Sequence, residues 1–214
     1  MKTNPYKYET VFITLIISFG LLLRGFNINF NDFWSDEMVS FYLSNPNLEF
    51  LETIKLIFDS NLTVTFEIIL KFFHKIFGYD FEYSRYLTLL LSILSIFYFY
   101  RLIKNNNSFY SAILGIILLS INIYHIRYSI ELRSYTLTFL LAIILLNLIF
   151  YQGKIREFKN FLSYLLIFIV SLLMLFSHAY SIIVMVSINF YIFLLWLIKK
   201  NFTKNNALLF LSIS

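Results

Sequence analysis

The sequence contains no cysteine and few charged residues, and both absences narrow what the chain can be. Without cysteine, disulfide bonds and thiolate metal sites are excluded. Only 14% of the 214 residues are charged, whereas 59% are hydrophobic and 21% aromatic, a balance that few soluble domains tolerate. No long soluble segment interrupts the apolar runs. The composition therefore predicts an integral membrane protein without a separate soluble domain.

Uncharged apolar runs predict transmembrane helices, because about 20 apolar residues cross a bilayer and flanking charged side chains extend shorter runs. A further run begins near Ala207 and stops at Ser214, so we expect the N-terminal part of a longer protein, or a truncated one. The expected fold is an all-α, polytopic transmembrane bundle of six spans plus this truncated seventh. The six spans are expected at Tyr8–Leu23, Tyr86–Tyr100, Ser108–Tyr124, Tyr135–Tyr151, Phe161–Ser177 and Tyr180–Leu197.

The distribution of basic residues predicts the orientation of these spans. With a cytoplasmic N-terminus, the inner segments carry only Glu9 and Glu157 as acids, and most of the lysine and arginine, as the positive-inside rule requires. The net charge of +5 is thus a topology signal, and no cluster of basic residues indicates a nucleic-acid surface. The inner basic residues are Lys2, Lys7, Arg101, Lys104, Lys154, Arg156, Lys159, Lys199, Lys200 and Lys204.

The outer loop, at about residues 24–85, is expected to contain three short helices. Ser35 is a candidate N-cap for a helix from Asp36 to about Leu43. The amphipathic pattern of Leu48–Phe58 predicts a helix in the membrane interface. A third helix, at about 63–77, is interfacial or shallowly re-entrant, because a full span here would invert every later loop. One stripe of it carries Thr63, Glu67, Lys71, His74 and Lys75.

Two adjacent carboxylates, Asp36 and Glu37, follow Trp34 just outside the first span. In one interpretation they complement the dipole of the helix that they begin, which stabilises it by about 0.3–1 kcal/mol each. In the other, one of them is a general base at the membrane surface. The position of the pair indicates which face of the membrane carries out the chemistry.

A second polar segment runs from Tyr128 to Tyr135, between the third and fourth spans, directly after His125 and Arg127. Arg133 and Tyr135 can be ordinary snorkelling and aromatic-belt residues. Two arginines and a histidine in a short outer loop nevertheless oppose the positive-inside rule. An anionic ligand is a second explanation, and a phosphate or pyrophosphate suits arginine, whose guanidinium binds phosphate through two hydrogen bonds.

Two further outer residues have alternative interpretations. His178 lies in a tight turn between the fifth and sixth spans, where it is a structural hydrogen-bonding residue or part of a site on the same face as Asp36. Arg85 leads into the second span, where snorkelling alone explains it.

Together, these motifs resemble the GT-C glycosyltransferases, nearest to the protein O-mannosyltransferases and the bacterial aminoarabinose-type transferases. The resemblance rests on four motifs in the same order, and it extends over residues 1–214 as the N-terminal part of such a transmembrane domain. The motifs are the Asp36-Glu37 pair, a glycine seven residues before an arginine (Gly78 to Arg85), Tyr-Ser-x-Glu-x-Arg-x-Tyr (Tyr128–Tyr135) and Ser-His-Ala-Tyr (Ser177–Tyr180).

The resemblance implies transfer of a sugar from a polyprenyl-phosphate donor to a protein, lipid or glycan acceptor at the outer face of the cell membrane. Asp36 would be the base, with Glu37 assisting, and Arg133, Arg85, His178 and Tyr135 would bind the donor phosphate. We expect no cofactor and no metal site. Relatives open the third loop helix with a His- or Glu-led Pro-Pro segment, whereas this chain has 61–63 as Asn-Leu-Thr.

Two other functions remain open at the level of sequence. A transporter or flippase for a lipid-linked sugar would need charged or broken positions at mid-membrane depth, and the predicted span interiors hold none. The second alternative is a truncated, inactive remnant that binds membrane lipids or a partner.

Overall fold

A computed structural model of the chain describes residues 5–26, 28–29, 32–60, 64–152, 154–155, 160–199 and 204–213. Its regular secondary structure is helical apart from one short β-hairpin, which confirms the predicted all-α class. Several residues used above lie outside the described ones: Lys2, Thr63 and the Asn-Leu-Thr segment that contains it, Arg156, Glu157, Lys159, Lys200 and Ser214.

The described residues form helices of 7 to 26 residues and one two-stranded hairpin. The strands β1 (Phe150–Tyr151) and β2 (Lys154–Ile155) pair antiparallel. The helices of the described residues are α1 (Pro5–Gly25), α2 (Ser35–Leu43), α3 (Phe50–Asp59), α4 (Val64–Phe77), α5 (Phe81–Asn106), α6 (Phe109–Ser120), α7 (Ile123–Ser129), α8 (Tyr135–Ile149), α9 (Phe161–Leu175), α10 (Ser181–Lys199) and α11 (Lys204–Ile213).

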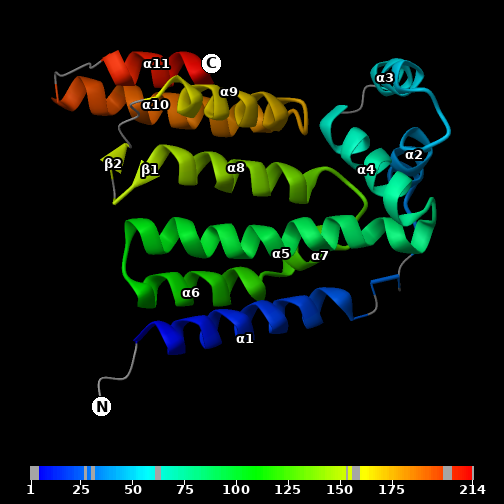
Figure 1. Ribbon diagram of the computed structural model, residues 1–214, viewed down its shortest axis with the longest axis horizontal. Helices are drawn as coiled ribbons and strands as arrows, with labels where there is room; N and C mark the ends of the chain where they lie inside the picture. The colour runs from blue at the N-terminus through cyan, green and yellow to red at the C-terminus, as the bar shows by residue number, and fades with distance from the viewer. Residues whose placement is uncertain are drawn as a thin grey trace.

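The long helices lie side by side, and the short helices α2, α3 and α4 gather at one end of them (Figure 1). We call this the loop end, and the opposite end, where β1 and β2 lie, the hairpin end. Helix α5 packs against α8 and α6, and α9 packs against α8 and α11. Buried apolar side chains such as Leu91, Leu141, Met174 and Ile192 form the core between these helices.

Helix α5 begins earlier than the sequence predicts. Gly78 has a φ of +103°, a conformation that favours glycine and that ends α4. Asp80 then caps α5, since its Oδ1 accepts hydrogen bonds from the backbone N–H groups of Glu82 (2.8 Å) and Tyr83 (3.3 Å). The expected span began at Tyr86, whereas the helix begins at Phe81, so Arg85 belongs to its second turn.

The third expected span is broken. Helices α6 and α7 meet at an angle of 60°. Asn122 caps α7 through the backbone N–H of His125, at 2.9 Å. The buried guanidinium of Arg24, at the end of α1, donates to the carbonyl of Ser120 (2.9 Å), to Ser92 Oγ (2.9 Å) and to His125 Nδ1 (2.7 Å). Arg24 therefore satisfies a free carbonyl group at the end of α6 and holds the break against α1 and α5.

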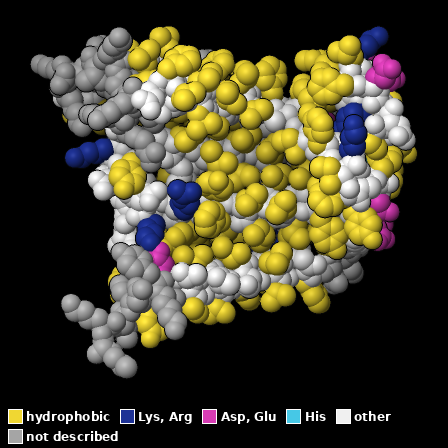
Figure 2. Space-filling model, viewed as in Figure 1, with side chains coloured by type: hydrophobic (Ala, Val, Ile, Leu, Met, Phe, Trp, Pro, Cys, Tyr) yellow, Lys and Arg dark blue, Asp and Glu magenta, His cyan; other side chains and the backbone are white. Residues whose placement is uncertain are grey.

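Among the described residues, two helices are long and apolar enough to cross a membrane, Tyr8–Gly25 and Phe81–Asn106, and a third if α6 and α7 count as one span. Helices α8, α9 and α10 supply shorter apolar stretches. Figure 2 shows one face on which hydrophobic side chains cover the middle and charged side chains lie toward the two ends. These features identify a membrane protein, but helix length does not confirm six spans and a seventh.

The three loop helices form where the sequence predicts them, with one difference at the cap of α2. Helix α3 forms over the amphipathic segment that the sequence predicts; Ile57 is buried, whereas Leu51 and Phe58 are exposed. The cap of α2 was predicted wrongly: Trp34, not Ser35, occupies the N-cap. The reason is that the carboxylate of Glu37 accepts the backbone N–H of Trp34 at 3.1 Å.

The polar stripe of α4 faces the protein interior for the most part. Lys71 Nζ donates to the carbonyl of Leu48 at 2.8 Å, and His74 Nε2 contacts Ser84 Oγ at 2.8 Å. Glu67, Lys71 and His74 are buried, whereas Lys75 is exposed. These contacts fix α4 against α5 and the segment after α2, and thereby position the first part of the loop.

Candidate functional site

A buried ion pair between Glu37 and Arg85 lies at the centre of the loop end. Arg85 Nη2 lies 2.9 Å from Glu37 Oε2, and Arg85 Nε donates to Oε1 at 3.2 Å. Both side chains are only 2% exposed. A buried charge is costly unless it is paired and hydrogen-bonded, and this two-point contact meets that condition. The pair therefore links α2 to α5.

The same pair contacts two other segments, residues 32–34 and the turn at Leu132. Glu37 Oε1 accepts the backbone N–H of Leu132 at 2.6 Å, and Oε2 accepts that of Trp34. Arg85 donates to the carbonyl of Asp32 (3.4 Å) and lies over the ring of Phe33, with 4.1 Å to its centroid. Both carboxylate oxygens of Glu37 are thus engaged, and the turn before α8 is tied to the start of α2.

Asp36 has a different environment from its neighbour. Its side chain is 69% exposed, and its Oδ2 lies 3.4 Å from Arg133 Nη2. Arg133 also donates to the backbone carbonyl of Asp36, at 3.4 Å. Because the carboxylate of Asp36 is open to solvent, its attraction to Arg133 is weak, and an incoming anion can replace it. The two acids of the motif therefore have separate partners and separate degrees of burial.

A row of aromatic rings extends from the Asp36–Arg133 pair. Tyr128 and Tyr135 have ring centroids 4.7 Å apart, and those of Tyr135 and His178 are 5.2 Å apart. His178 Nδ1 accepts the backbone N–H of Tyr180 at 3.2 Å, which assigns the ring proton to Nε2. Burial, with a smaller contribution from the charge of Arg133, lowers the pKa of His178 below its usual value. The ring is therefore neutral at physiological pH and has an N–H to donate.

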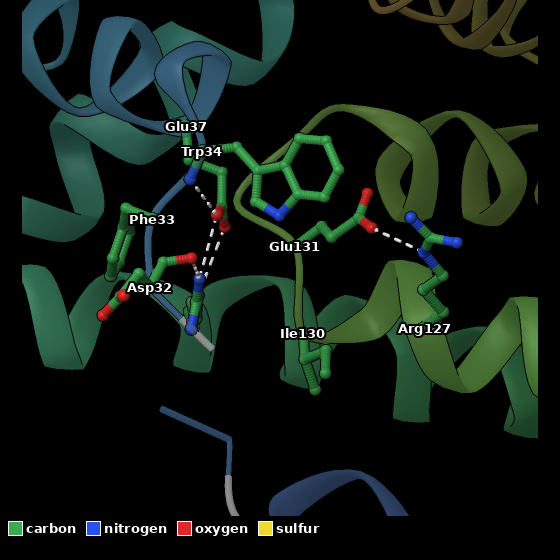
Figure 3. Close-up of a pocket in the computed structure, with 8 residues that line it drawn as sticks. Asp32, Phe33, Trp34, Glu37, Arg127, Ile130 and Glu131 are labelled. Carbon is green, nitrogen blue, oxygen red and sulfur yellow. Dashed lines mark hydrogen bonds and ion pairs between the residues drawn. The ribbon is translucent and has the colours of Figure 1, made fainter. Parts of the chain in front are cut away.

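Two adjoining cavities open at this end of the protein. Their volumes are about 600 Å³ and about 230 Å³. They share Trp34, Glu37, Arg127 and Glu131 as walls, and Figure 3 shows these side chains around the larger one. The larger is completed by Asp32, Phe33, Arg85 and Ile130, and the smaller by Asp36, Tyr128, Arg133 and Tyr135.

The structure brings most of the predicted site residues together. Asp36, Glu37, Arg133 and Tyr135 line the smaller cavity, and Arg85 lines the larger one beside Glu37. His178 does not line either of these cavities, and it joins the group through its ring contact with Tyr135.

Asp32, which lines the larger cavity, was not predicted as part of the site. Arg127 and Glu131 line it too; the sequence marked them as members of the outer polar segment but did not predict that they pair, at 3.1 Å. The spacing of four between Arg127 and Glu131 was a signal that could have identified this pair. The hydrogen bond from the backbone N–H of Leu132 to Glu37, by contrast, cannot be predicted from the sequence, because every residue type except proline has this group. Among the described residues, no group of three histidine, aspartate or glutamate side chains lies close enough to hold a metal ion.

Glu67 lies buried behind this site. Its Oε1 accepts a hydrogen bond from Ser40 Oγ at 3.1 Å, and the residue is only 2% exposed. Among the described groups, Oε2 has no hydrogen-bond partner. Burial raises the pKa of Glu67 to about 7, from an ordinary value of 4.5. The folded protein therefore favours the protonated form of this carboxyl group.

This shift predicts a pH-dependent stability. A carboxyl group with a raised pKa in the folded state makes its full contribution below pH 4.5 and loses it as the pH rises through about 7. The loss is roughly 3 kcal/mol, since one pKa unit corresponds to about 1.4 kcal/mol. The thermal midpoint of the purified protein is expected to fall between pH 5 and pH 8 by more than that of Glu67→Gln. Parallel curves for the two proteins would contradict an ionising buried Glu67.

Comparisons of the chain with protein-family models, with curated protein sequences and with solved structures find no match. What the site can do therefore follows from its own chemistry. Arg127 and Arg133 can bind an anion, and Asp36 can accept a proton. The neutral His178 and Tyr135 can donate hydrogen bonds beside them.

Proposed function

We propose that this chain carries the site of a membrane glycosyltransferase that uses a polyprenyl-phosphate-linked sugar. The observation that carries the proposal is the contact between Asp36 and Arg133. These residues are 97 positions apart in the sequence, yet they face one cavity at the loop end. A proton acceptor next to an exchangeable phosphate-binding group is what transfer from a sugar phosphate requires.

In the proposed reaction the acceptor hydroxyl attacks the anomeric carbon of the sugar. The carbon–oxygen bond to the phosphate breaks, its electron pair leaves with the phosphate oxygen, and the hydroxyl proton passes to Asp36. Arg133 binds the phosphate and so releases the carboxylate of Asp36, with Tyr135 and His178 as further donors. Glu37 and Arg85 hold the site together, because both oxygens of Glu37 are already engaged.

Phosphate recognition is tested at Arg133. Arg133→Ala is expected to weaken binding of a polyprenyl-phosphate sugar about 10- to 100-fold, since a hydrogen bond to a charged group contributes about 1.5–3 kcal/mol. Arg133→Lys is expected to restore only part of the affinity, because lysine lacks the planar fork. Binding is measured by calorimetry on the full-length protein in detergent, with Arg101→Ala at the hairpin end as the control. Equal donor affinity of wild type and Arg133→Ala would show that the turn with Arg133 does not bind the phosphate.

We further propose six spans, the start of a seventh and a cytoplasmic N-terminus, so that the loop end faces outward. The support is that α1, α5, the α6–α7 pair, α8, α9 and α10 run in alternating directions across the protein (Figure 1). Their chain connections lie at the loop end and the hairpin end in turn, and Arg101 and Lys104 lie toward the hairpin end. Flanking charged and aromatic side chains allow helices as short as α8 and α9 to span.

Because the chain lacks cysteine, the orientation can be tested with one introduced thiol at a time. Asn47→Cys, exposed at the loop end, is expected to react with an impermeant maleimide in intact cells. Asn107→Cys, exposed at the hairpin end, is expected to react only after permeabilisation. The reverse pattern would overturn both the topology and the outer location of the site.

A transporter of a lipid-linked sugar is the second candidate, and the broken α6–α7 pair favours it. Broken helices next to a buried charge, here Arg24, are typical of transporter binding sites. Reconstituted vesicles separate the two functions. A glycosyltransferase consumes the donor and labels an acceptor, whereas a transporter moves an unchanged donor between leaflets.

A further inference from the structure

Trp34 is a large aromatic side chain set in polar surroundings. It is 61% exposed and lines both cavities of the site. Figure 3 shows its indole extending from the side of Glu37 toward Glu131, across the larger cavity. An exposed tryptophan near a membrane is ordinarily an interfacial anchor. Here, however, the charged residues Asp36, Arg127, Glu131 and Arg133 line the same smaller cavity as Trp34, which is a setting for a polar ligand.

The backbone beneath this exposed ring is held from two sides. Trp34 is the N-cap of α2, and its N–H donates to the buried carboxylate of Glu37 at 3.1 Å. Its carbonyl accepts the N–H of Met38 at 3.0 Å. Since Glu37 is itself paired with Arg85, the Cα of Trp34 is fixed relative to α5. The side chain is therefore presented to the cavity from a defined position, and little freedom is lost when a ligand covers it.

The chemistry of the walls indicates the ligand. A sugar ring has a face of C–H groups made slightly positive by neighbouring oxygens, and this face complements the negative face of an indole. Its hydroxyl groups lie at the edge, where carboxylates accept and a guanidinium donates hydrogen bonds. Asp32, Glu131 and Arg127 supply these groups around Trp34 in the larger cavity.

We propose that Trp34 stacks on the transferred sugar of the donor and determines which sugar is accepted. This inference deepens the proposed function and rests on it. Trp34 is a wall of both the smaller cavity, which holds Asp36 and Arg133, and the larger one. A donor whose phosphate contacts Arg133 therefore places its sugar at the indole, with the anomeric carbon toward Asp36.

The test uses the small number of tryptophans in the chain. Trp34 and Trp196 are the two present, so Trp196→Phe leaves Trp34 as the single tryptophan, whose emission is excited selectively over that of tyrosine. Titration of this full-length variant with a polyprenyl-phosphate sugar is expected to change the Trp34 emission. Polyprenyl phosphate without a sugar is expected to bind and to leave the emission nearly unchanged. An equal change with both ligands would mean that the indole does not contact the sugar.

Substitutions at Trp34 then separate stacking from membrane anchoring. Trp34→Leu, which keeps an apolar side chain, is expected to bind the sugar-bearing donor about 10-fold more weakly, with unchanged affinity for polyprenyl phosphate. Trp34→Phe is expected to retain most of the sugar-dependent affinity. Thermal midpoints of the variants verify their folding.

The outcomes also distinguish this inference from the proposed function. If Trp34→Leu binds both ligands as well as wild type, or loses affinity for both equally, Trp34 does not recognise the sugar, while phosphate binding stands. If the wild-type protein binds neither polyprenyl ligand, the glycosyltransferase proposal fails and the stacking role fails with it.

Discussion

Replacing Glu37 with glutamine is expected to destabilise the folded protein by about 3–5 kcal/mol, the usual cost of removing one partner from a buried ion pair. The variant leaves the guanidinium of Arg85 buried, 2% exposed, without its charge partner. The two carboxylate oxygens of Glu37 accept the N–H groups of Trp34 and Leu132, and glutamine puts a neutral amide in their place. Thermal unfolding in detergent, followed by circular dichroism, measures the effect.

Two comparisons assign this loss to the buried charge. The double variant Glu37→Gln with Arg85→Met is expected to recover part of the stability, because it removes the unpaired charge as well. Asp36→Asn changes the adjacent carboxylate, which is 69% exposed, and is expected to leave the thermal midpoint nearly unchanged. Similar midpoints for Glu37→Gln and Asp36→Asn would show that the Glu37–Arg85 pair does not stabilise the loop end.

The Asp36→Asn variant is expected to lower the rate of sugar transfer by about 10²- to 10⁴-fold, the range typical of losing a general base. Asparagine keeps the size of aspartate and its suitability for the first turn of a helix, so the fold is expected to persist. Donor binding is expected to be equal or tighter, because Arg133 no longer has a competing carboxylate. The rate is measured as sugar transfer from a polyprenyl-phosphate donor by the full-length protein in nanodiscs.

Asp59→Asn is the matched control, since Asp59 is an exposed acid of the same loop at the end of α3. It is expected to retain the wild-type rate. If Asp36→Asn has a normal rate, and Glu37→Gln loses its rate at unchanged stability, then Glu37 is the base and Asp36 is not. Normal rates for both variants would show that the two acids have only a structural role and that neither is catalytic.

Much of the coarse architecture was predictable from local patterns. Apolar runs predicted most of the helices, and the periodicity of residues 48–58 predicted the amphipathic helix that the structure has at α3. Boundaries were less predictable because they depend on single contacts. Asp80 extended α5 upstream of Tyr86, and Arg24 with Asn122 broke the helix expected over Ser108–Tyr124. The contact of Arg24 joins residues that are distant in the sequence. Asp80 and Asn122 are local capping residues, and whether such a residue caps a helix depends on the surrounding fold.

The sequence by itself determined that this is an α-helical membrane protein, because composition and apolar run length depend on the chain alone. It also identified Asp36, Glu37, Arg85 and Arg133 as notable polar residues, because charges are rare in such a chain. Only the tertiary structure decided their partners. Neighbouring residues of a helix point about 100° apart, so Glu37 turns inward to Arg85 while Asp36 turns outward to Arg133. That divergence is set by packing between α2, α5 and the turn before α8, over separations that no local pattern records.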